Sequence, residues 1–332
     1  MLSAQLTTGG RGDLQGAERV AAPHAIVSVV IPTLNGGKEL GACLKAIRRQ
    51  ELDRPFEIIC IDSGSTDDTL DHCRKFEVRL IEIDRQTFNH GLTRNEAVRA
   101  ARGEFVALLT QDSVPLGTDW LRHHVEALES IPRAAGSYGR QVPRESVNPY
   151  LRWRLAQWGA SRSTRVVQEV TDRNVFEEAS PLEKLATVTF DNVNSCIRKS
   201  VWEAIPFSRV DFGEDIDWGL RVIRAGHAIV YEPGARVLHS HNESLRGDFK
   251  RVYSDHRNLN RLLGMKQIPT LRCVLRCTAS GVDTLWRTVP LDNYPLLKRL
   301  YWRFYAVPWS LVQNAAQYFG ARSNSSRAST GS

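Results

Sequence analysis

The sequence predicts an α/β fold built on an open parallel sheet, with a basic helical region at the C-terminal end. Short apolar runs rich in β-branched residues alternate with helical periodicity from residue 25 to about residue 130. This alternation is typical of parallel sheets that helices cover on both faces. A second observation is the charge distribution, because residues 1–245 carry a net charge of −3 and residues 246–332 carry +10.

The first half of the chain contains four predicted strands, each a short apolar run, at residues 26–31, 57–62, 78–83 and 105–109. Helices are expected between them because apolar side chains recur every three or four residues. They cover residues 38–50, a segment that begins near residues 65–68, residues 93–101 and residues 119–130. In the last of these helices, His123 and His124 are expected on a solvated face.

The periodicity weakens after residue 140. Residues 144–190 are rich in Arg, Trp and Glu, and we expect helices and loops that cover a cleft. A strand at 191–197, a short helix from Lys199 and a helix at 215–225 that ends at Gly226 follow. Two short strands are expected at 228–230 and 235–239, and the chain becomes basic and helical from Ser244.

Several classes of protein are disfavoured by composition and motifs. The basic charge lies outside the folded body, which argues against a nucleic-acid partner. The six cysteines form no CxxC pair, so reduced cytosolic thiols are the better interpretation. The N-terminus lacks the pattern of a signal peptide, and residues 304–321 would make a poor spanning helix. No GxGxxG motif occurs, and Gly36-Gly37-Lys38 lacks the first glycine and the Ser/Thr of a P-loop.

Carboxylates at predicted strand ends are the main chemical signal. Asp62 closes the second strand and Asp112 follows the fourth, so both would project into the crevice at the carboxyl ends of the strands. A third cluster contains Glu214, Asp215 and Asp217. Each acid alone could merely cap a helix or complement its dipole. Together they provide what a general base requires, a carboxylate held near a cleft.

Two histidines extend this cluster. His239 and His241 lie two residues apart on a strand-like segment, which predicts that they face opposite ways. A lone histidine on a strand is usually structural. A carboxylate and an imidazole beside a diphosphate are nevertheless adequate ligands for Mg²⁺ or Mn²⁺.

Five blocks, in order, resemble family 2 glycosyltransferases with the GT-A fold. They read VSVVIPTLNGGKELGACLKAI, EIICIDSGSTDDT, NHGLTRNEA, RGEFVALLTQDSVP and FGEDIDWGLRVIRAGHAIVYEPGARVLHSH. Within that family, TQDSVP and the VLHSHNESL segment are most similar to bacterial rhamnosyltransferases of surface-polysaccharide assembly.

The resemblance divides the chain into segments. The glycosyltransferase domain would cover residues 25–245, with a nucleotide-sugar half at 25–140 and an acceptor half at 141–245. Residues 1–24 would be a flexible leader, residues 246–320 a basic, aromatic helical region, and residues 321–332 a disordered tail.

The resemblance also implies roles for the residues that match the family's motifs. The donor-binding residues would be Pro32, Thr33, Asn35, Asp62, Ser63, Arg94, Gln111 and Asp112. Asp62 would hydrogen-bond to the pyrimidine, and Arg94 would approach the diphosphate. Asp112 stands where the metal-binding acid of the DxD motif would be, but Gln111-Asp112-Ser113 supplies one acid rather than two. The second metal ligand would then be His239 or His241, and the family's VxH spacing favours His239.

On the acceptor side, Asp215 matches the catalytic base, with Glu214 beside it, and Trp218 would pack under the acceptor sugar. Asn194 would bind acceptor hydroxyls, although a satisfied turn residue is about as expected. A glycosidase would need two carboxyl groups flanking one bond. Here the acids are split between a nucleotide side and an acceptor side, which favours transfer.

The resulting hypothesis is an inverting glycosyltransferase that moves L-rhamnose from dTDP-L-rhamnose to a lipid-linked bacterial glycan. Asp215 would be the base, and a divalent metal with Arg94 would stabilise the leaving diphosphate. The alternatives are a transferase of the same fold that uses a UDP-hexose, and a non-catalytic nucleotide- or carbohydrate-binding protein.

The expected location is cytoplasmic, with a peripheral association at the inner face of the plasma membrane. Residues 286–319 contain nine of the 27 aromatic residues, interleaved with cations, which suits an anionic membrane surface. The alternative, to which we give equal weight, is that this segment is a helical subdomain that packs on the body of the protein.

Overall fold

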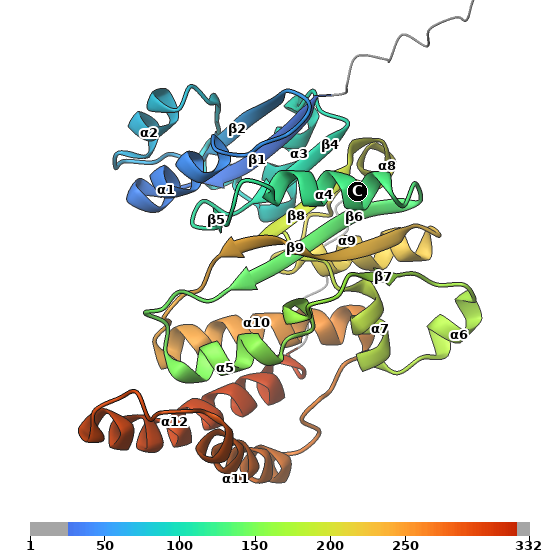
Figure 1. Ribbon diagram of the computed structural model, residues 1–332. Helices are drawn as coiled ribbons and strands as arrows, with labels where there is room; N and C mark the ends of the chain where they lie inside the picture. Colours follow the sequence, from blue (N-terminus) through green and yellow to red (C-terminus); the bar gives the residue numbers. More distant parts are fainter. Residues whose placement is uncertain (1–25, 324–332) are drawn as a thin grey trace, which may run out of the picture.

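A mixed sheet forms the centre of the molecule, with helices on both faces and a helical group at one end (Figure 1). The computed structural model describes residues 26–323, so the leader expected at 1–24 and most of the tail lie outside the described residues. The strands are β1 (Val27–Thr33), β2 (Phe56–Asp62), β3 (Arg79–Glu82), β4 (Phe105–Leu109), β5 (Val114–Pro115), β6 (Ala134–Val142), β7 (Val166–Gln168), β8 (Asn194–Arg198) and β9 (Ala228–Leu238).

The helices fall into three groups along the chain. Those of the first half are α1 (Gly37–Ile47), α2 (Thr69–Lys75), α3 (His90–Ala100) and α4 (Trp120–Glu129). Those of the middle are α5 (Pro149–Gln157), α6 (Arg173–Glu178), α7 (Pro181–Val188), α8 (Lys199–Ala204) and α9 (Glu214–Arg224). The last three are α10 (Leu245–Leu263), α11 (Leu271–Thr288) and α12 (Leu296–Gly320).

The strand order is β3-β2-β1-β4-β8-β6-β9-β5, with β7 paired to β9. The predicted parallel pairing holds for β3, β2, β1 and β4. It does not extend to β8, which runs antiparallel to β4 and to β6. The reason is that the chain enters β8 beside the carboxyl end of β4, where Asn194 pairs with Leu109, and not through a crossover helix.

Alternating side chains of β1 build two cores. Val27 and Ile31 belong to a cluster that α1 and α4 cover, whereas Val30 belongs to a cluster shared with α3 and α9. Strands buried on both faces explain why the sequence reads as near-continuous apolar runs.

Two sequence expectations in the second half are corrected. The strands predicted at 228–230 and 235–239 are one strand, β9, with a register shift opposite Gly139 and Arg140. This irregularity accommodates Pro233 and Gly234, which weaken a regular ladder. The sequence pattern also missed β6, whose residues AAGSYGRQV lack β-branched alternation.

The helix α4 also differs from expectation in one respect. His124 is fully buried rather than solvated, and its ring nitrogens lie 2.9 Å from Ser137 Oγ and 3.0 Å from Asn194 Oδ1. His123 is partly exposed and pairs with Asp119. The helical period therefore turns His124, and not His123, toward the sheet.

The basic C-terminal region forms the helices α10, α11 and α12, as predicted, and they lie at the end of the molecule opposite β1 and β2 (Figure 1). A third core joins them to α5 through Tyr150, Leu285 and Trp309. Residues 321 and 322, which were expected to belong to a disordered tail, pack on the helical region instead, because Ala321 is buried and Arg322 donates to the carbonyls of Ile268 and Pro269. Within residues 26–323, no helix has the length and apolar character to cross a membrane.

Candidate active site

The predicted functional residues gather at one edge of the sheet. Strands β1, β2, β3, β4, β6 and β9 all end at this edge, and β8 begins there. Loops that follow or precede these strands therefore carry their side chains into a common space, which we call the carboxyl edge.

The donor-side residues form a hydrogen-bonded network at the ends of β1 and β2. Thr33 Oγ1 donates to Asp62 Oδ1 at 3.0 Å, and the backbone N–H groups of Gly64 and Ser65 donate to Asp62 Oδ2 at 3.0 and 2.8 Å. Ser63 N donates to the Thr33 carbonyl at 3.0 Å. Asp62 is thus a buried carboxylate held in one orientation by several donors.

The turn after β1 is shaped by two other predicted residues. Asn35 adopts a left-handed backbone with φ of 47°, and its side-chain oxygen accepts from Thr66 N at 2.8 Å. Gln111 bonds both backbone groups of Leu34, at 2.9 and 3.0 Å. Pro32 pairs with Ile61 in the β1–β2 ladder. Gln111 therefore fixes the segment that contains Asp112 against this turn.

A cluster of three ligand-type side chains follows β4 and β9. The carboxylate oxygen Oδ2 of Asp112 lies 3.3 Å from His239 Nε2 and 2.8 Å from His241 Nε2. The two histidine nitrogens are 3.1 Å apart. Burial favours the neutral acid, but contacts with His239 and His241 outweigh it and hold the pKa of Asp112 well below its usual range. The pKa of His241 is raised by Asp112.

The expectation that His239 and His241 face opposite ways is wrong. Strand β9 ends at Leu238, so the alternation of a strand does not apply to the two histidines. Both rings turn toward Asp112, so His241 lies beside this carboxylate as well as His239.

The three side chains fit a divalent metal ion. Their ligand atoms all lie within 4.8 Å of one another. Neighbouring ligands in an octahedral site with bonds of about 2.1 Å are roughly 3 Å apart, and the three separations are 2.8, 3.1 and 3.3 Å. Asp112 Oδ2 is also buried without a well-oriented hydrogen bond. One carboxylate with two imidazoles is a suitable donor set for Mn²⁺ or Mg²⁺.

Gln141, at the end of β6, orients His239. Its Nε2 donates to Asp191 Oδ2, which leaves its Oε1 to accept from His239 Nδ1 at 2.8 Å. In a neutral His239 ring this network places the proton on Nδ1, so that Nε2, which faces Asp112, is free to bind a metal ion. Such partners fix the tautomer of a metal ligand.

A second carboxylate cluster lies at the start of α9. Arg94 Nη1 donates to Glu214 Oε1 at 2.6 Å, and both side chains are buried. Asn192 Nδ2 donates to the same oxygen at 3.2 Å. Asp215 Oδ1 accepts from Ile216 N at 2.8 Å, and its Oδ2 lies 3.5 Å from Asn192 N.

The two acids of this cluster have opposite acidities. Burial, Glu214 and Asp191 raise the pKa of Asp215 well above its usual value. For Glu214, burial acts in the same direction, but Arg94 and His90 outweigh it and lower the pKa. One acid is therefore held ionised and its neighbour is made more basic, which is the arrangement expected of a general base.

The segment Asp191–Asn192 contacts both clusters. Asp191 reaches His239 through Gln141, and Asn192 reaches Glu214 and Asp215. The structure thus brings Asp112, His239, His241, Glu214 and Asp215 to one edge.

Three predicted residues are placed differently from expectation. Arg94 pairs with Glu214 and does not stand free for a diphosphate. Trp218 is fully buried, packs against Phe190 and Phe207 and donates to the Ile205 carbonyl, so it cannot lie under a sugar. Asn194 is also fully buried, and its amide is used by Trp120, His124 and Ala235.

Three residues of this edge, Gln141, Asp191 and Arg144, were not among the predicted site residues. Arg144 Nη2 donates to the Asp112 carbonyl at 2.6 Å and is a half-buried cation beside the three-ligand cluster. The sequence signal for Gln141 and Arg144 is their place at and just after the end of β6, a strand that the pattern itself missed. Asp191 was assigned to a strand, but it precedes β8.

Comparison with known proteins places these features in a family. The family model described as Glycosyl transferase family 2 matches residues 28–181. The chain is 30% identical over 233 residues to the O-antigen chain rhamnosyltransferase RfbN of Salmonella typhimurium, which covers 68% of this chain and 70% of the relative. It is also 30% identical over 232 residues to the O-antigen chain rhamnosyltransferase WbaN of Salmonella anatum, with the same two coverages.

Solved structures share the fold. The mannosyltransferase PcManGT from Pyrobaculum calidifontis, solved with GDP-Man and Mn²⁺, has a TM-score of 0.55 at 15% identity and covers 90% of this chain and 88% of its own. Glucosyl-3-phosphoglycerate synthase of M. tuberculosis has a TM-score of 0.51 at 18% identity, with coverages of 73% and 82%. At these identities the likeness shows the fold alone, and it confirms the predicted class of sheet.

Proposed function

This chain belongs to glycosyltransferase family 2 and is related to O-antigen rhamnosyltransferases, and from that premise we propose that it transfers L-rhamnose from dTDP-L-rhamnose, with inversion, to a bacterial glycan. The observation that carries the proposal is that a three-ligand cluster and a basic carboxylate lie at the same edge of the sheet. Sugar transfer uses both in this proposal: the three-ligand cluster serves the leaving diphosphate, and the basic carboxylate serves the acceptor hydroxyl.

On the donor side, Asp62 is the proposed partner of the pyrimidine base. Its orientation is held by Thr33 and by the N–H groups of residues 64 and 65. Pro32, Asn35 and Ser63 shape the wall of the same pocket in this proposal.

Asp112, His239 and His241 are the proposed ligands of Mg²⁺ or Mn²⁺. When bound, such an ion supplies positive charge against the leaving diphosphate. Arg144 is a further candidate for this electrostatic role, because its guanidinium reaches the Asp112 backbone. In this proposal Arg144 has the role that was first expected for Arg94.

Asp215 is the proposed general base. The acceptor oxygen forms a bond to the anomeric carbon, the bond from that carbon to the diphosphate oxygen breaks, and the hydroxyl proton passes to Asp215. General-base catalysis of this kind contributes roughly 10²–10⁴-fold. Glu214 is proposed to support this base, because its charge raises the proton affinity of Asp215. Arg94 in turn keeps Glu214 ionised.

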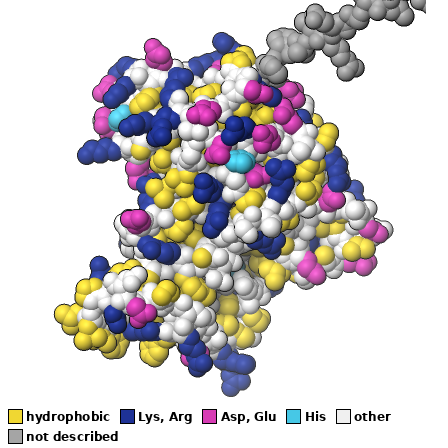
Figure 2. Space-filling model, in the orientation of Figure 1, with side chains coloured by type: hydrophobic (Ala, Val, Ile, Leu, Met, Phe, Trp, Pro, Cys, Tyr) yellow, Lys and Arg dark blue, Asp and Glu magenta, His cyan; other side chains and the backbone are white. Residues whose placement is uncertain are grey.

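The acceptor is proposed to be lipid-linked, with the enzyme in the cytoplasm and bound to the inner face of the plasma membrane. Among the described residues, eleven of the seventeen exposed large hydrophobic side chains lie between 271 and 319. Seven of them form what we call the apolar stripe of α12, namely Leu296, Leu297, Leu300, Tyr301, Phe304, Val307 and Leu311. Figure 2 shows hydrophobic side chains gathered at this protruding end of the molecule, with cations beside them.

The geometry of α12 supports a surface role for the stripe. At about 100° per residue, the seven positions occupy about 140° of the helix. The opposite side carries Ala306, Trp309 and Ala316, which are buried against the neighbouring helices. A helix that is apolar on both sides needs a second apolar partner. A bilayer surface with anionic headgroups suits Arg303, which borders the stripe.

A donor screen tests the proposal. The purified full chain, with Mg²⁺ or Mn²⁺ and a lipid-linked glycan acceptor, is incubated with dTDP-L-rhamnose, UDP-glucose, UDP-N-acetylglucosamine and GDP-mannose. Release of dTDP in excess of the other nucleotides is expected. Preferred release of UDP would replace the donor assignment by a UDP-hexose, and tight donor binding without any turnover would point to a non-catalytic protein.

A further inference from the structure

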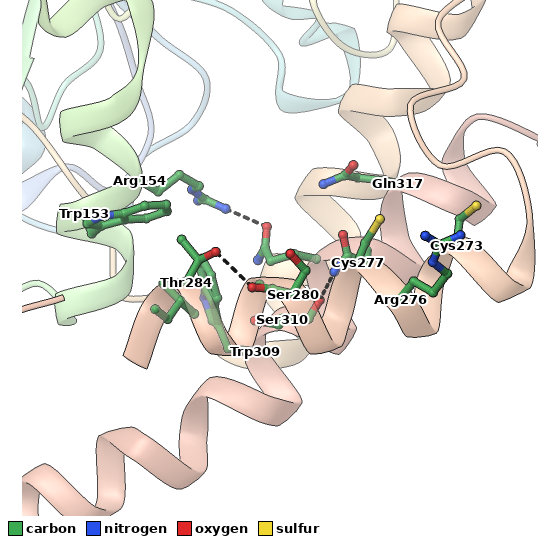
Figure 3. Close-up of a pocket in the computed structure, with 14 residues that line it drawn as sticks. Trp153, Arg154, Cys273, Arg276, Cys277, Ser280, Thr284, Trp309, Ser310 and Gln317 are labelled. Carbon is green, nitrogen blue, oxygen red and sulfur yellow. Dashed lines mark hydrogen bonds between the residues drawn. The ribbon is translucent and has the colours of Figure 1, made fainter. Parts of the chain in front are cut away.

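A cavity of about 610 Å³ lies among α5, α11 and α12, apart from the carboxyl edge (Figure 3). Trp153 and Arg154 come from α5, Arg276 and Ser280 from α11, and Trp309 from α12. None of the fourteen lining residues is Asp or Glu, whereas two are arginines. The lining therefore favours an anionic ligand.

Arg154 is the less exposed of the two arginines that line this cavity. Its Nη1 donates to Gln313 Oε1 at 2.6 Å, and its guanidinium lies 5.6 Å from the centre of the Trp309 ring. Within residues 26–323, no carboxylate lies within salt-bridge distance of Arg154, and Asp248, Asp255 and the cation Arg251 act on it from longer range. Its remaining N–H groups are suited to an anionic oxygen.

Gln313 adds an unused donor. Its side chain is buried, and its Nε2 has no hydrogen-bond partner although Oε1 is bonded to Arg154. A buried polar group without a partner is costly, and a bound ligand oxygen would remove that cost. Arg154 and Gln313 together present donors on one side of the cavity.

The cavity also has an apolar component that continues to the surface. Trp153, Trp309 and Leu285 supply apolar lining. Asn314, another lining residue, lies three positions after Leu311 of the apolar stripe, and residues at that spacing are neighbours on a helix surface. A ligand with a long apolar chain can therefore leave the cavity beside the stripe.

We propose that this cavity binds the phosphate end of an anionic lipid, that is, a phosphate ester of a long apolar chain. Arg154 and the Gln313 amide bind the phosphate, and Arg276 adds positive charge toward the other end of the lining. The tryptophans contact the first part of the chain, and the stripe of α12 meets the bilayer. The biological role of this site rests on the proposed transfer to a lipid-linked acceptor.

The position of α5 connects this cavity with the active site. Arg144 donates to the Asp112 carbonyl, and α5 begins five residues later and carries Trp153 and Arg154. From Pro149 to Arg154 the helix rises only about 8 Å. A lipid phosphate in the cavity would thus hold the attached glycan near the carboxyl edge.

Titration calorimetry of the full chain tests the proposal with defined probes. Farnesyl phosphate carries both phosphate and chain, farnesol lacks the phosphate, and inorganic phosphate lacks the chain. Farnesyl phosphate is expected to bind at least tenfold more tightly than either. Dihexanoyl phosphatidylglycerol is a further probe. If it binds more tightly than farnesyl phosphate, the source of the phosphate is a membrane phospholipid. If farnesyl phosphate binds more tightly, the source is an isoprenoid carrier.

Matched variants locate the binding. Arg276→Gln removes an exposed cation of the lining and should weaken farnesyl phosphate binding at least fivefold, whereas Arg272→Gln, one turn away and outside the lining, should not. Gly281 lines the cavity, and a Cβ placed there would meet Ser310 Oγ at 3.4 Å. Gly281→Phe should therefore fill the cavity and abolish binding, while Gly281→Ala should retain it.

Equal affinities for farnesol and farnesyl phosphate would overturn the proposal, as would normal binding by folded Gly281→Phe together with Arg276→Gln. Failure of the transferase assignment is visible separately in the wild-type chain. Farnesyl phosphate binding without sugar transfer from any donor would leave the lipid site standing. Rhamnose transfer without farnesyl phosphate binding would remove the lipid site and leave the transferase.

Discussion

Arg94 and Glu214 lie 120 positions apart in the sequence and form a buried ion pair, with the Arg94 Nη1 to Glu214 Oε1 distance at 2.6 Å. The pair joins α3, which belongs to the first half of the chain, to the start of α9. Glu214 directly precedes Asp215, so the charge of Glu214 acts on the proposed base. Arg94 is thus a positioning residue for the carboxylates.

Replacing Glu214 by glutamine is expected to move the acidic limb of the pH–rate profile to lower pH. Glu214 raises the pKa of Asp215, so removal of its charge lowers that pKa and leaves more Asp215 ionised in acid. Arg94 would then be buried without a charged partner, at a cost of about 3–5 kcal/mol in unfolding free energy. The measurements are kcat/KM against pH and denaturant unfolding.

Asp217→Asn is the matched control for that change. Asp217 lies on the same helix and pairs with Arg221 at 2.9 Å, away from Asp215. The acidic limb of the pH–rate profile of Asp217→Asn should stay at the wild-type pH. An unshifted limb in Glu214→Gln, with a shifted limb in Asp217→Asn, would contradict the proposed coupling.

Asp215→Asn should abolish most transfer while preserving donor binding. The amide can still accept from Ile216 N through its oxygen, so the loop is expected to keep its shape. It cannot take a proton, and the rate should fall roughly 10²–10⁴-fold. The dTDP affinity, measured by calorimetry, should change little. Asp211→Asn, at an exposed neighbouring acid, should have normal turnover, and near-normal turnover by Asp215→Asn would remove it as the base.

Metal affinity should depend on Gln141 as well as on the ligands. His239→Ala or His241→Ala removes one of three ligands and should abolish tight Mn²⁺ binding, followed by electron paramagnetic resonance. Gln141→Leu leaves the ligands intact but frees the His239 ring, and an affinity loss of roughly 10–100-fold is expected. His123→Ala, on α4, is the control. Equal Mn²⁺ affinity in wild type and in both ligand variants would exclude the site.

The sequence was sufficient for the elements whose own residues determine them. The strands β1, β2 and β4 are β-branched runs, and their predicted ends differ from the observed ones by at most two residues. The carboxylates at strand ends were identifiable for the same reason. Strand β6 was not, because its glycines and small residues become a strand only between β8 and β9.

The site contacts between distant segments were beyond local patterns. The convergence of His239 and His241 depends on where β9 ends, and the orientation of His239 depends on Gln141, 98 positions earlier. Trp218 is instructive because a local signal existed. It lies four positions before the buried Val222, on the inward face of α9, although its acidic neighbours suggested a sugar contact.

His124 is expected to make the fold sensitive to mild acid. Burial lowers the pKa of His124 from 6.5 to about 4. Between these values the unfolded chain binds a proton that the folded chain does not, so this contribution to stability is complete above pH 6.5 and is lost as the pH falls toward 4. The maximum is about 3 kcal/mol. Unfolding free energies at pH 7 and pH 5 measure it.

His124→Gln removes the titration and keeps an amide that can bond Ser137 or Asn194. The variant should be less stable than wild type at pH 7, but its stability should change less between pH 7 and pH 5. His123→Gln, at the partly exposed neighbour, should show the same difference in stability between pH 7 and pH 5 as the wild type. An identical pH dependence in all three proteins would contradict the assignment to His124.

Flotation with vesicles examines the apolar stripe of α12. Leu297 and Phe304 are 81% and 74% exposed, so the double change to serine should not disturb folding. Partial burial of each side chain in a bilayer stabilises binding by about 1–2 kcal/mol. The vesicle affinity should therefore fall at least tenfold. Vesicles containing phosphatidylglycerol should bind more strongly than neutral ones, and salt should reduce that difference.

The control for this experiment is Leu182→Ser, because Leu182 is 67% exposed but lies on α7, outside the C-terminal helices. Its flotation should match that of wild type. If the stripe were instead covered by a second copy of the chain, the serine variant would float normally and lose a dimer in sedimentation. The two outcomes differ in both readouts, since a bilayer-binding stripe affects the vesicle fraction and leaves the sedimentation coefficient unchanged.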